Sequence, residues 1–251
     1  DWVFGLSGKL QSLESGADEL ASIVYTSGTT GRSKGVMLSH RNIIANAFAA
    51  AACTQWQGDE RFLSFLPLSH MLERTAGYYM PMIVGAEVIY ARSIAQLADD
   101  LQTVKPTTLV SVPRIYERVY GKIQDGLRKK SAVARTLFKW AVNVGWRKFE
   151  WQQGRARWHP KLLLWPLLNK LVASKVLEKL GGELRIAVCG GAALSEDVAR
   201  LFIGLGLPLV QGYGLTESSP VVCVNRLDDN IPSSIGTVLP GTEIRIAEKD
   251  E

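Results

Sequence analysis

The stretch YTSGTTGRSKGV, residues 25–36, sets five small hydroxyl residues among three glycines and carries two positive charges. Glycines let successive backbone N–H groups turn toward one point, and Ser and Thr hydroxyls add donors where a larger side chain would not fit. Arg32 and Lys34 supply the countercharge that several phosphate oxygens require. This combination predicts a loop that binds phosphate groups.

Two common nucleotide loops do not match the stretch. In G-x-x-x-x-G-K-[ST] the lysine follows a glycine and precedes a hydroxyl residue, whereas Lys34 lies between Ser33 and Gly35. The dinucleotide pattern G-x-G-x-x-G fails because Gly28, Gly31 and Gly35 are three and four residues apart. A flexible Gly/Ser linker is the simpler alternative, but such linkers rarely join an apolar run to a capped helical pattern such as SHRNIIANAFAAAA.

Two later segments, CGGAALS (189–195) and QGYGLTES (211–218), each end an apolar run with glycines. The second offers an aromatic ring at Tyr213, a hydroxyl at Thr216 and a carboxylate at Glu217. Ligands of open α/β sheets bind outside the carboxyl ends of the strands, so we expect both segments to converge there. A purine on Tyr213, phosphates on the first loop and Mg²⁺ near Glu217 would together form an ATP site.

The elements that would position these groups alternate along the chain. Apolar or β-branched runs occur as ASIVYTS, RFLSFLP, AEVIYA, TTLVSVP, LRIAVCGG and LPLVQGYG, with helix-compatible segments between most of them. One connecting helix, SEDVARLFIGLG, begins at a capping Ser195 and carries Glu196 and Asp197 at its positive end. This pattern predicts the α/β class, with a mostly parallel sheet flanked by helices.

Residues 113–180 differ from the rest, because they form long, basic and aromatic helical patterns around breaks at Gly154 and His159-Pro160. We interpret them as a basic helical insertion. From residue 114 to residue 185 the chain holds 17 Lys or Arg against 5 Asp or Glu, although the formal net charge of the whole chain is only +5.

Tryptophan is concentrated in the same insertion, with five of the seven tryptophans between Trp140 and Trp165. Basic side chains beside amphipathic rings predict contact with an anionic membrane surface. The alternative is that the tryptophans pack a helical subdomain and that the charges only solvate its outer face.

Composition bounds the remaining possibilities. With 251 residues, 47% of them hydrophobic, the chain can bury a substantial core and is not a disordered protein. Three widely spaced cysteines without a CxxC pair argue against a disulfide framework or zinc site and fit a reducing, cytoplasmic compartment.

No secretory leader opens the chain, and the most apolar window, residues 162–177, is short and interrupted, so we expect no bilayer-spanning segment. The final segment, GTEIRIAEKDE, has the pattern of a strand.

Four segments, in order, resemble the motifs of the acyl-adenylate-forming enzymes, specifically the long-chain fatty acid–CoA ligases: YTSGTTGRSKGV, LPLSHMLER, QGYGLTES and SIGTVLPGTEIRI. The resemblance covers essentially the whole chain, and it implies that residues 1–251 are the central fragment of that family's large N-terminal adenylation domain. The first part of that domain, the ribose-binding aspartate, the interdomain hinge and the small C-terminal domain with its catalytic lysine would lie outside the chain. We therefore expect activity of the parent protein and none of this fragment alone.

The resemblance implies roles for individual residues. Thr26 and Glu217 would approach Mg²⁺, Ser27 to Lys34 would contact the phosphates, and Thr216 would contact the α-phosphate. The catalytic positions implied are Thr26, Lys34, His70 and Glu217. The nucleotide-binding positions implied are Ser27, Gly28, Thr29, Thr30, Gly31, Gly191, Ala192, Gln211, Gly212, Tyr213 and Thr216.

Three of these assignments have simpler alternatives. Glu217 could be a surface carboxylate at the start of a helix, Tyr213 could pack in the core, and His70 could be an ordinary hydrogen-bonded side chain rather than a group between acyl chain and nucleotide.

The implied reaction joins a fatty acid to AMP with release of pyrophosphate, and then passes the acyl group to the thiol of coenzyme A. ATP, Mg²⁺ and coenzyme A are the implied cofactors. Amino-acid-activating relatives carry an aspartate that holds the substrate amine, whereas SHMLERTAG has none, which favours an acyl substrate without an amine.

Two other classes of function stay open from the sequence alone. One is an inactive homologue or scaffold, and the other is a membrane- or nucleic-acid-binding module that uses the basic insertion. Four ordered adenylation motifs argue against nucleic acid as a partner. Self-association into a homodimer and a peripheral location at the inner face of a membrane are also left open.

Overall fold

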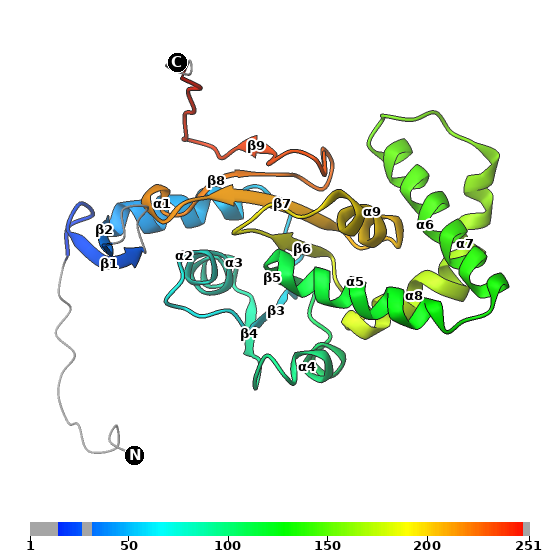
Figure 1. Cartoon of the computed structure of the whole chain (residues 1–251). Helices are drawn as coiled ribbons and strands as arrows, with labels where there is room; N and C mark the ends of the chain where they lie inside the picture. Colours follow the sequence, from blue (N-terminus) through cyan, green and yellow to red (C-terminus); the bar gives the residue numbers. More distant parts are fainter. Residues whose placement is uncertain (1–14, 27–31, 248–251) are drawn as a thin grey trace.

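The computed structural model describes residues 15–26 and 32–247. Its centre is a seven-stranded sheet with the order β4-β3-β5-β6-β7-β8-β9 (Figure 1). Neighbours from β4 to β7 run parallel, whereas β8 and β9 continue the sheet antiparallel. The strands are β3 (Arg61–Ser64), β4 (Glu87–Tyr90), β5 (Thr108–Ser111), β6 (Ile186–Cys189), β7 (Leu209–Gly214), β8 (Val221–Val224) and β9 (Thr237–Val238). The α/β class with a mostly parallel sheet is confirmed.

The strand expected at ASIVYTS is present as β1 (Leu20–Thr26), but it does not belong to the parallel sheet. It pairs antiparallel with β2 (Lys34–Ser39) in a separate two-stranded sheet, in which Thr26 lies opposite Lys34. The apolar runs did not predict β2, because KGVMLS is short and leads directly into α1 (His40–Ala51). A strand therefore stands on each side of the predicted phosphate loop.

Helix α1 (His40–Ala51) follows β2 directly and is capped as its sequence predicts. The Ser39 hydroxyl accepts a hydrogen bond from the backbone N–H of Asn42 at 3.2 Å, and the Asn42 side chain accepts one from the Ser39 N–H at 3.0 Å. The same layer contains α2 (Met71–Glu73), η1 (Arg74–Tyr79) and α3 (Met80–Val84). This layer covers one face of the sheet, where it packs on Phe62 and Val110.

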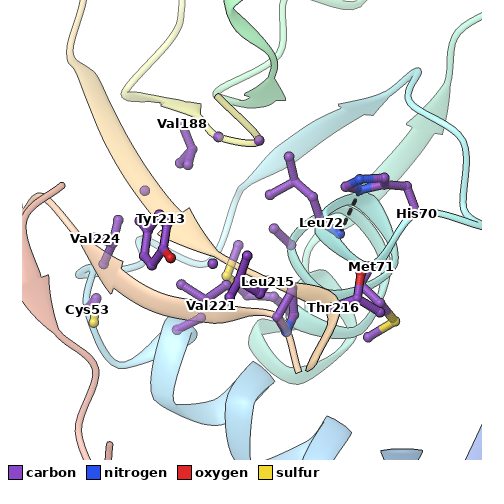
Figure 2. Close-up of a pocket in the computed structure, with 18 of the residues that line it drawn as sticks. Cys53, His70, Met71, Leu72, Val188, Tyr213, Leu215, Thr216, Val221 and Val224 are labelled. Carbon is purple, nitrogen blue, oxygen red and sulfur yellow. Dashed lines mark hydrogen bonds between the residues drawn. The ribbon is translucent and has the colours of Figure 1, made fainter. Parts of the chain in front are cut away.

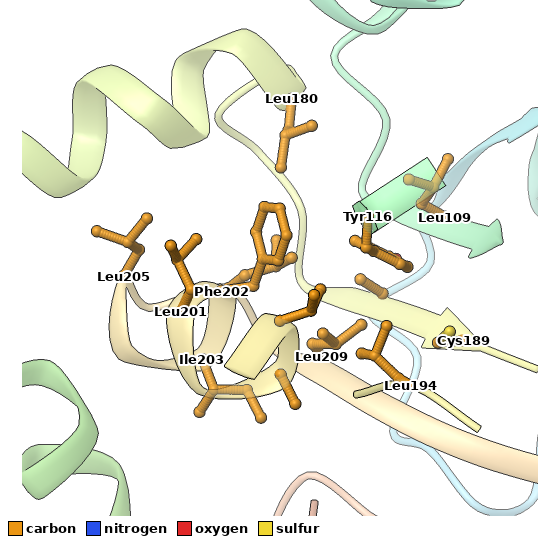
Figure 3. Packing of buried hydrophobic residues seen from close by; sticks show 14 of the residues in the cluster. Leu109, Tyr116, Leu180, Cys189, Leu194, Leu201, Phe202, Ile203, Leu205 and Leu209 are labelled. Carbon is orange, nitrogen blue, oxygen red and sulfur yellow. The ribbon is translucent and has the colours of Figure 1, made fainter. Parts of the chain in front are cut away.

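The other face of the sheet packs on α4 (Leu97–Val104), α5 (Pro113–Arg128) and α9 (Glu196–Gly204). Phe202 of α9 is fully buried in this layer, and its ring centre lies 5.4 Å from that of Tyr116 (Figure 3). The expected strand–helix–strand unit is present as β6-α9-β7, and the Ser195 hydroxyl accepts a hydrogen bond from the Val198 N–H at the helix start.

The insertion is helical, as predicted. After α5 it consists of α6 (Ala132–Gln152), η2 (Pro160–Leu164), α7 (Trp165–Leu168), η3 (Asn169–Ala173), α8 (Ser174–Leu177) and η4 (Glu178–Leu180). Both predicted breaks are found, since α6 ends just before Gly154, which has φ +70°, and η2 begins after His159. Among the described residues, no helix is both long and apolar enough to cross a membrane.

The tryptophans of the insertion divide between packing and exposure. Trp165 lies so close to α6 that a Cβ on Gly145 would come within 2.4 Å of its ring, and the Arg200 guanidinium lies 5.1 Å from the ring centre of Trp146. Trp140, Trp151 and Trp158 are exposed. Packing of the subdomain therefore accounts for Trp146 and Trp165, and membrane contact by the exposed tryptophans stays a prediction.

The strand expected over GTEIRIAEKDE is wrong for the part that the structure describes. Residues 242–247 form no strand, and residues 248–251 lie outside the described ranges. Ile246 is 91% exposed, and no described strand lies beside this segment to complete a ladder. A strand pattern alone cannot supply the partner that backbone hydrogen bonding requires.

Candidate active site

The carboxyl edge of β6 and β7 opens into a cavity of about 540 Å³ (Figure 2). This volume is within the ordinary range for small-molecule sites. Its walls come from the β1-β2 hairpin, from α1 and the turn after it, from the LPLSHMLER segment with η1 and α3, and from β6, β7 and β8. Three of the four sequence motifs thus meet at one cavity.

The hairpin contributes Thr26 and Lys34, which pair across β1 and β2 and both line the cavity. The five residues between them that the sequence assigns to phosphate, Ser27, Gly28, Thr29, Thr30 and Gly31, lie outside the described residues. A hydroxyl and an ammonium group therefore face the cavity from the two strands that lead to and from the predicted phosphate loop.

Glycines shape the edge of β6 and β7. A Cβ on Gly190 would lie 3.2 Å from the Leu72 side chain and 3.7 Å from the carbonyl oxygen of Gly212. Gly191 has φ +83°, a conformation that other residues rarely adopt. Gly190, Gly191 and Gly212 all line the cavity, so backbone rather than side chains meets a ligand here, which suits a flat ring.

Two predicted nucleotide-binding residues occupy other places. Ala192 follows Gly191 in the chain and is exposed, but it is not part of the cavity lining. The Gln211 side chain holds two loops together, because its Oε1 accepts a hydrogen bond from the Leu194 N–H at 2.9 Å and its Nε2 donates to the carbonyl of Pro232. Gln211 thus holds the glycine turn after β6 in place without lining the cavity itself.

Tyr213, Thr216 and Glu217 all line the cavity. Tyr213 is 42% exposed, so it is not a core side chain. Thr216 and Glu217 begin the short helix η5 (Thr216–Ser218), and Glu217 is exposed in its first turn. The simpler description of Glu217, a carboxylate at a helix start, is compatible with a role in the cavity.

Asn46 positions this turn, and the sequence analysis missed it. Its side chain donates to the carbonyl of Val221 at 2.7 Å and accepts from the N–H of Val221 at 3.0 Å. It is almost fully buried on α1 and so ties α1 to the chain that follows η5. An asparagine inside the otherwise apolar run IIANAFAAA was the available signal, because buried amides need partners.

The LPLSHMLER segment is held against the hairpin. Arg74 donates from Nη1 to the Ser22 hydroxyl at 2.8 Å and from Nε to the carbonyl of Leu68 at 3.1 Å. His70 lines the cavity as the N-cap of α2, and its Nδ1 accepts a hydrogen bond from the Leu72 N–H at 3.2 Å. His70 is therefore a hydrogen-bonded side chain, as the simpler alternative states, and it also lines the cavity.

Glu73 of the same segment is buried, with 1% of its surface exposed. The Ser64 hydroxyl donates to its Oε1 at 2.5 Å, while Oε2 has no hydrogen-bond partner. Burial raises the pKa of Glu73 to about 7, although hydrogen bonds from Ser64 and from the Phe65 backbone oppose the shift. Its carboxyl also packs on Gly77, where a Cβ would lie 2.5 Å from Oε1.

The inner end of the cavity is apolar. Ile186 and Val188 point to the same face of β6 as Gly190, and Ile186 lies about 13 Å before Gly190 along the strand. Through Thr108, Ile186 is level with Phe62, and the ring of Trp56 lies 5.9 Å from that of Phe62. The cavity therefore runs from glycines and polar groups at the edge of the sheet to a wall at Trp56.

Small and apolar residues make up much of the remaining lining of the cavity. They are Ala50, Ala76, Met71, Met80, Val221 and Val224. The Trp56 indole is held in place by a hydrogen bond from its Nε1 to the carbonyl of Ala51 at 2.8 Å. Such a lining can bury an extended hydrocarbon chain.

The donor set at the edge fits a hard divalent cation. Thr26 supplies a hydroxyl and Glu217 a carboxylate, and both are oxygen ligands of the kind that Mg²⁺ prefers. The described residues contain no group of three or more His, Cys, Asp or Glu that could hold a metal alone. Two oxygen ligands would leave most positions around such an ion open to water or to the oxygens of a ligand.

The chain matches the family model described as AMP-binding enzyme over residues 6–251. It is 35% identical over 238 residues to long chain acyl-CoA synthetase 7, peroxisomal, of Arabidopsis thaliana, covering 93% of this chain and 32% of the relative. It is also 35% identical over 261 residues to the chloroplastic long-chain-fatty-acid–[acyl-carrier-protein] ligase AEE15 of the same plant, covering 93% and 35%.

Among solved structures, ATP-bound MatB from Rhodopseudomonas palustris superposes with a TM-score of 0.65 at 25% identity, over 95% of this chain and 37% of that one. The chain thus spans about a third of the length of the curated relatives that it matches. The family model, which matches nearly every residue, agrees with the motifs and with the cavity that they line. This chain belongs to the family of AMP-binding enzymes.

Proposed function

We propose that this chain is the central part of the adenylation domain of a ligase that uses ATP to activate a long-chain fatty acid. The observation that carries the proposal is one cavity that is lined by glycines, Lys34 and Glu217 and also by Trp56 and a set of small and apolar side chains. One cavity of this form can hold a nucleotide and a hydrocarbon chain with their reacting groups side by side.

The nucleotide would lie along the edge of the sheet. The adenine would rest on Tyr213 and against the backbone of Gly191 and Gly212, where no side chain intervenes. Lys34, with the loop that precedes it, would hold the phosphates by charge, and the Thr216 hydroxyl would donate to the α-phosphate. Magnesium bound by Thr26 and Glu217 would offset the charge of the phosphate oxygens.

The fatty acid would fill the inner compartment, with its carboxylate near His70. A carboxylate oxygen attacks the α-phosphorus of ATP, the bond to the bridging oxygen of pyrophosphate breaks, and acyl-AMP and pyrophosphate form. Close placement of the two reactants supplies much of the rate. In the second step a thiol sulfur attacks the acyl carbonyl, AMP leaves, and the thiol proton passes to solvent.

The acceptor thiol is that of coenzyme A or of an acyl carrier protein. The names of two relatives differ on this point, one being an acyl-CoA synthetase and the other an acyl-carrier-protein ligase. We propose coenzyme A as the acceptor, with a cytoplasmic location of the full-length protein.

The test is exchange of labelled pyrophosphate into ATP by the full-length protein, with palmitate, with a series of amino acids, or with no acid. Exchange that requires palmitate supports the proposal. Exchange that requires an amino acid, or no exchange with any acid by folded protein, contradicts it. Thioester formation is then compared with coenzyme A and with phosphopantetheinylated acyl carrier protein as acceptors.

A further inference from the structure

The stretch from Trp151 to Leu177 contains five basic residues and no Asp or Glu. It also exposes large apolar side chains, with Leu163 72% and Leu167 57% accessible. We define the leucine patch as the exposed residues Trp158, Leu163, Leu164, Leu167 and Leu171. Contiguous exposed apolar side chains of this kind mark interaction surfaces more often than ordinary solvent-facing ones.

The local fold explains why these leucines face outward. The segments η2, α7 and η3 follow one another, and Leu162, Leu168 and Ala173 turn inward to the core, with Leu162 and Leu168 packing against α6. The patch leucines recur every three or four residues between these inward positions and so form one outer stripe. The segment is therefore apolar on both sides, and only the inner side has a partner in the described part of the chain.

The charged residues within residues 151–177 are all of one sign. Arg157, Lys161 and Lys170 are exposed beside it. Their aliphatic stems can lie along the leucines while the charged heads project outward. A second copy of the same face would bring like charges together, whereas an anionic surface complements them.

We propose that the leucine patch docks the protein on the surface of an anionic lipid bilayer. The leucines enter the boundary between headgroups and acyl chains, Trp158 lies at the polar edge of that boundary, and Arg157, Lys161 and Lys170 bind lipid phosphates. The contact is shallow and peripheral, because short helical segments present the patch. It requires neither the cavity nor its ligands, so it is independent of the proposed ligase activity.

The test is co-sedimentation of the full-length protein with vesicles of phosphatidylcholine alone or of phosphatidylcholine mixed with an equal amount of phosphatidylglycerol. One variant carries Leu163→Ser, Leu167→Ser and Leu171→Ser, and a second carries Arg157→Glu, Lys161→Glu and Lys170→Glu. We expect each to weaken binding to the mixed vesicles roughly tenfold or more. Since all six side chains are exposed, unchanged circular dichroism checks that the fold is kept.

The matched control carries Arg128→Glu, Lys129→Glu and Lys130→Glu at the turn between α5 and α6, which changes the charge by the same amount away from the patch. We expect this variant to bind the mixed vesicles no more than about twofold more weakly, because charges far from the contact act weakly in salt. The fluorescence emission of Trp158 should shift to the blue when the protein binds the mixed vesicles. This emission is obtained by subtracting the spectrum of a Trp158→Phe variant.

Four results would overturn the proposal. They are equal binding to neutral and anionic vesicles, equal loss in the control and patch variants, no Trp158 shift, and no vesicle binding at all. In the last case, dissociation of an oligomer by the leucine variant would show that a second copy occupies the patch.

Discussion

The carboxyl edge of the sheet and the helical insertion are held together by different contacts. At the edge, buried or half-buried amides bond to the backbone beside the turns, as Asn46 does to Val221 at the start of β8 and Gln211 to Leu194. These bonds fix the direction in which each turn presents its groups to the cavity.

In the insertion, α6 approaches α9 so closely that a Cβ on Gly145 would lie 1.9 Å from the carbonyl oxygen of Gly204. Close packing of this kind fixes distances and contributes to stability through burial. We therefore expect substitutions that remove groups facing the cavity to change the rate of the reaction more than the free energy of unfolding. Substitutions in the insertion should change the free energy of unfolding more than the rate.

The largest effect is expected for Glu217→Gln in the full-length protein. The amide keeps the shape of the side chain but loses the negative charge that would hold Mg²⁺ against the phosphates. We expect adenylation, measured by pyrophosphate release, to fall at least about 100-fold, with the free energy of unfolding unchanged. Glu196→Gln changes an exposed carboxylate on α9 outside the cavity and should leave pyrophosphate release unchanged. Normal pyrophosphate release by the Glu217 variant would remove Glu217 from the site.

The next effect concerns Glu73, which is buried at the edge and links the two kinds of contact. Its pKa is about 7 in the folded protein against 4.5 ordinarily, so the folded state binds more protons between these values. Stability should therefore fall as pH rises from about 4.5 to about 7 and then level off, a loss of about 3 kcal/mol from this group. Glu73→Gln removes the titration, so the difference in unfolding free energy between pH 5 and pH 8 should shrink by about that amount. An unchanged pH dependence would show that Glu73 is not the group responsible.

In the insertion, Gly145→Ala should lower the free energy of unfolding by about 2 kcal/mol or more, because the new methyl group meets Gly204 and Trp165. Its effect on the kcat of adenylation should be small. Gly121→Ala on α5 is the matched control, since a Cβ there meets nothing within 4 Å. That control should stabilise the protein by about 0.5 to 1 kcal/mol. A Gly145 variant of normal stability and reduced kcat would reverse the comparison between the two regions.

The sequence predicted most of the fold because its signals are local. Apolar runs marked six strands, and Ser39 and Ser195 marked two helix starts that the structure confirms. Strands β2, β8 and β9 were missed, and residues 242–247 were wrongly given a strand. Each missed strand is short and pairs antiparallel with a strand close by in the chain, and the turn between two such strands sets their pairing, which an apolar run does not reveal.

The candidate site was predictable only where motifs name it. Motifs identified the turns that carry Lys34, Tyr213 and Glu217, and the cavity brings them together. They gave no sign of Asn46, whose partner Val221 is far along the chain, or of Trp56, which lies in none of the motifs. An asparagine in an apolar run indicates that its amide needs a partner, but only the packing of α1 against the chain after η5 shows that the partner is Val221.

The smallest effect, on selectivity rather than rate, is expected at Trp56. Its ring lines the cavity and lies 5.9 Å from that of Phe62, which is level with Ile186 in the sheet, so it should limit the length of the acyl chain. Trp56→Ala, and more mildly Trp56→Phe, should move the ratio of kcat/KM for longer over shorter saturated acids upward, roughly tenfold for Ala, since each methylene in an apolar pocket is worth about 1 to 3 kcal/mol. Trp140→Ala removes an exposed tryptophan from the insertion and should leave the ratio unchanged. Loss of activity with every acid would instead count against the proposed reaction, whereas full activity with an unchanged ratio would show that another residue ends the compartment.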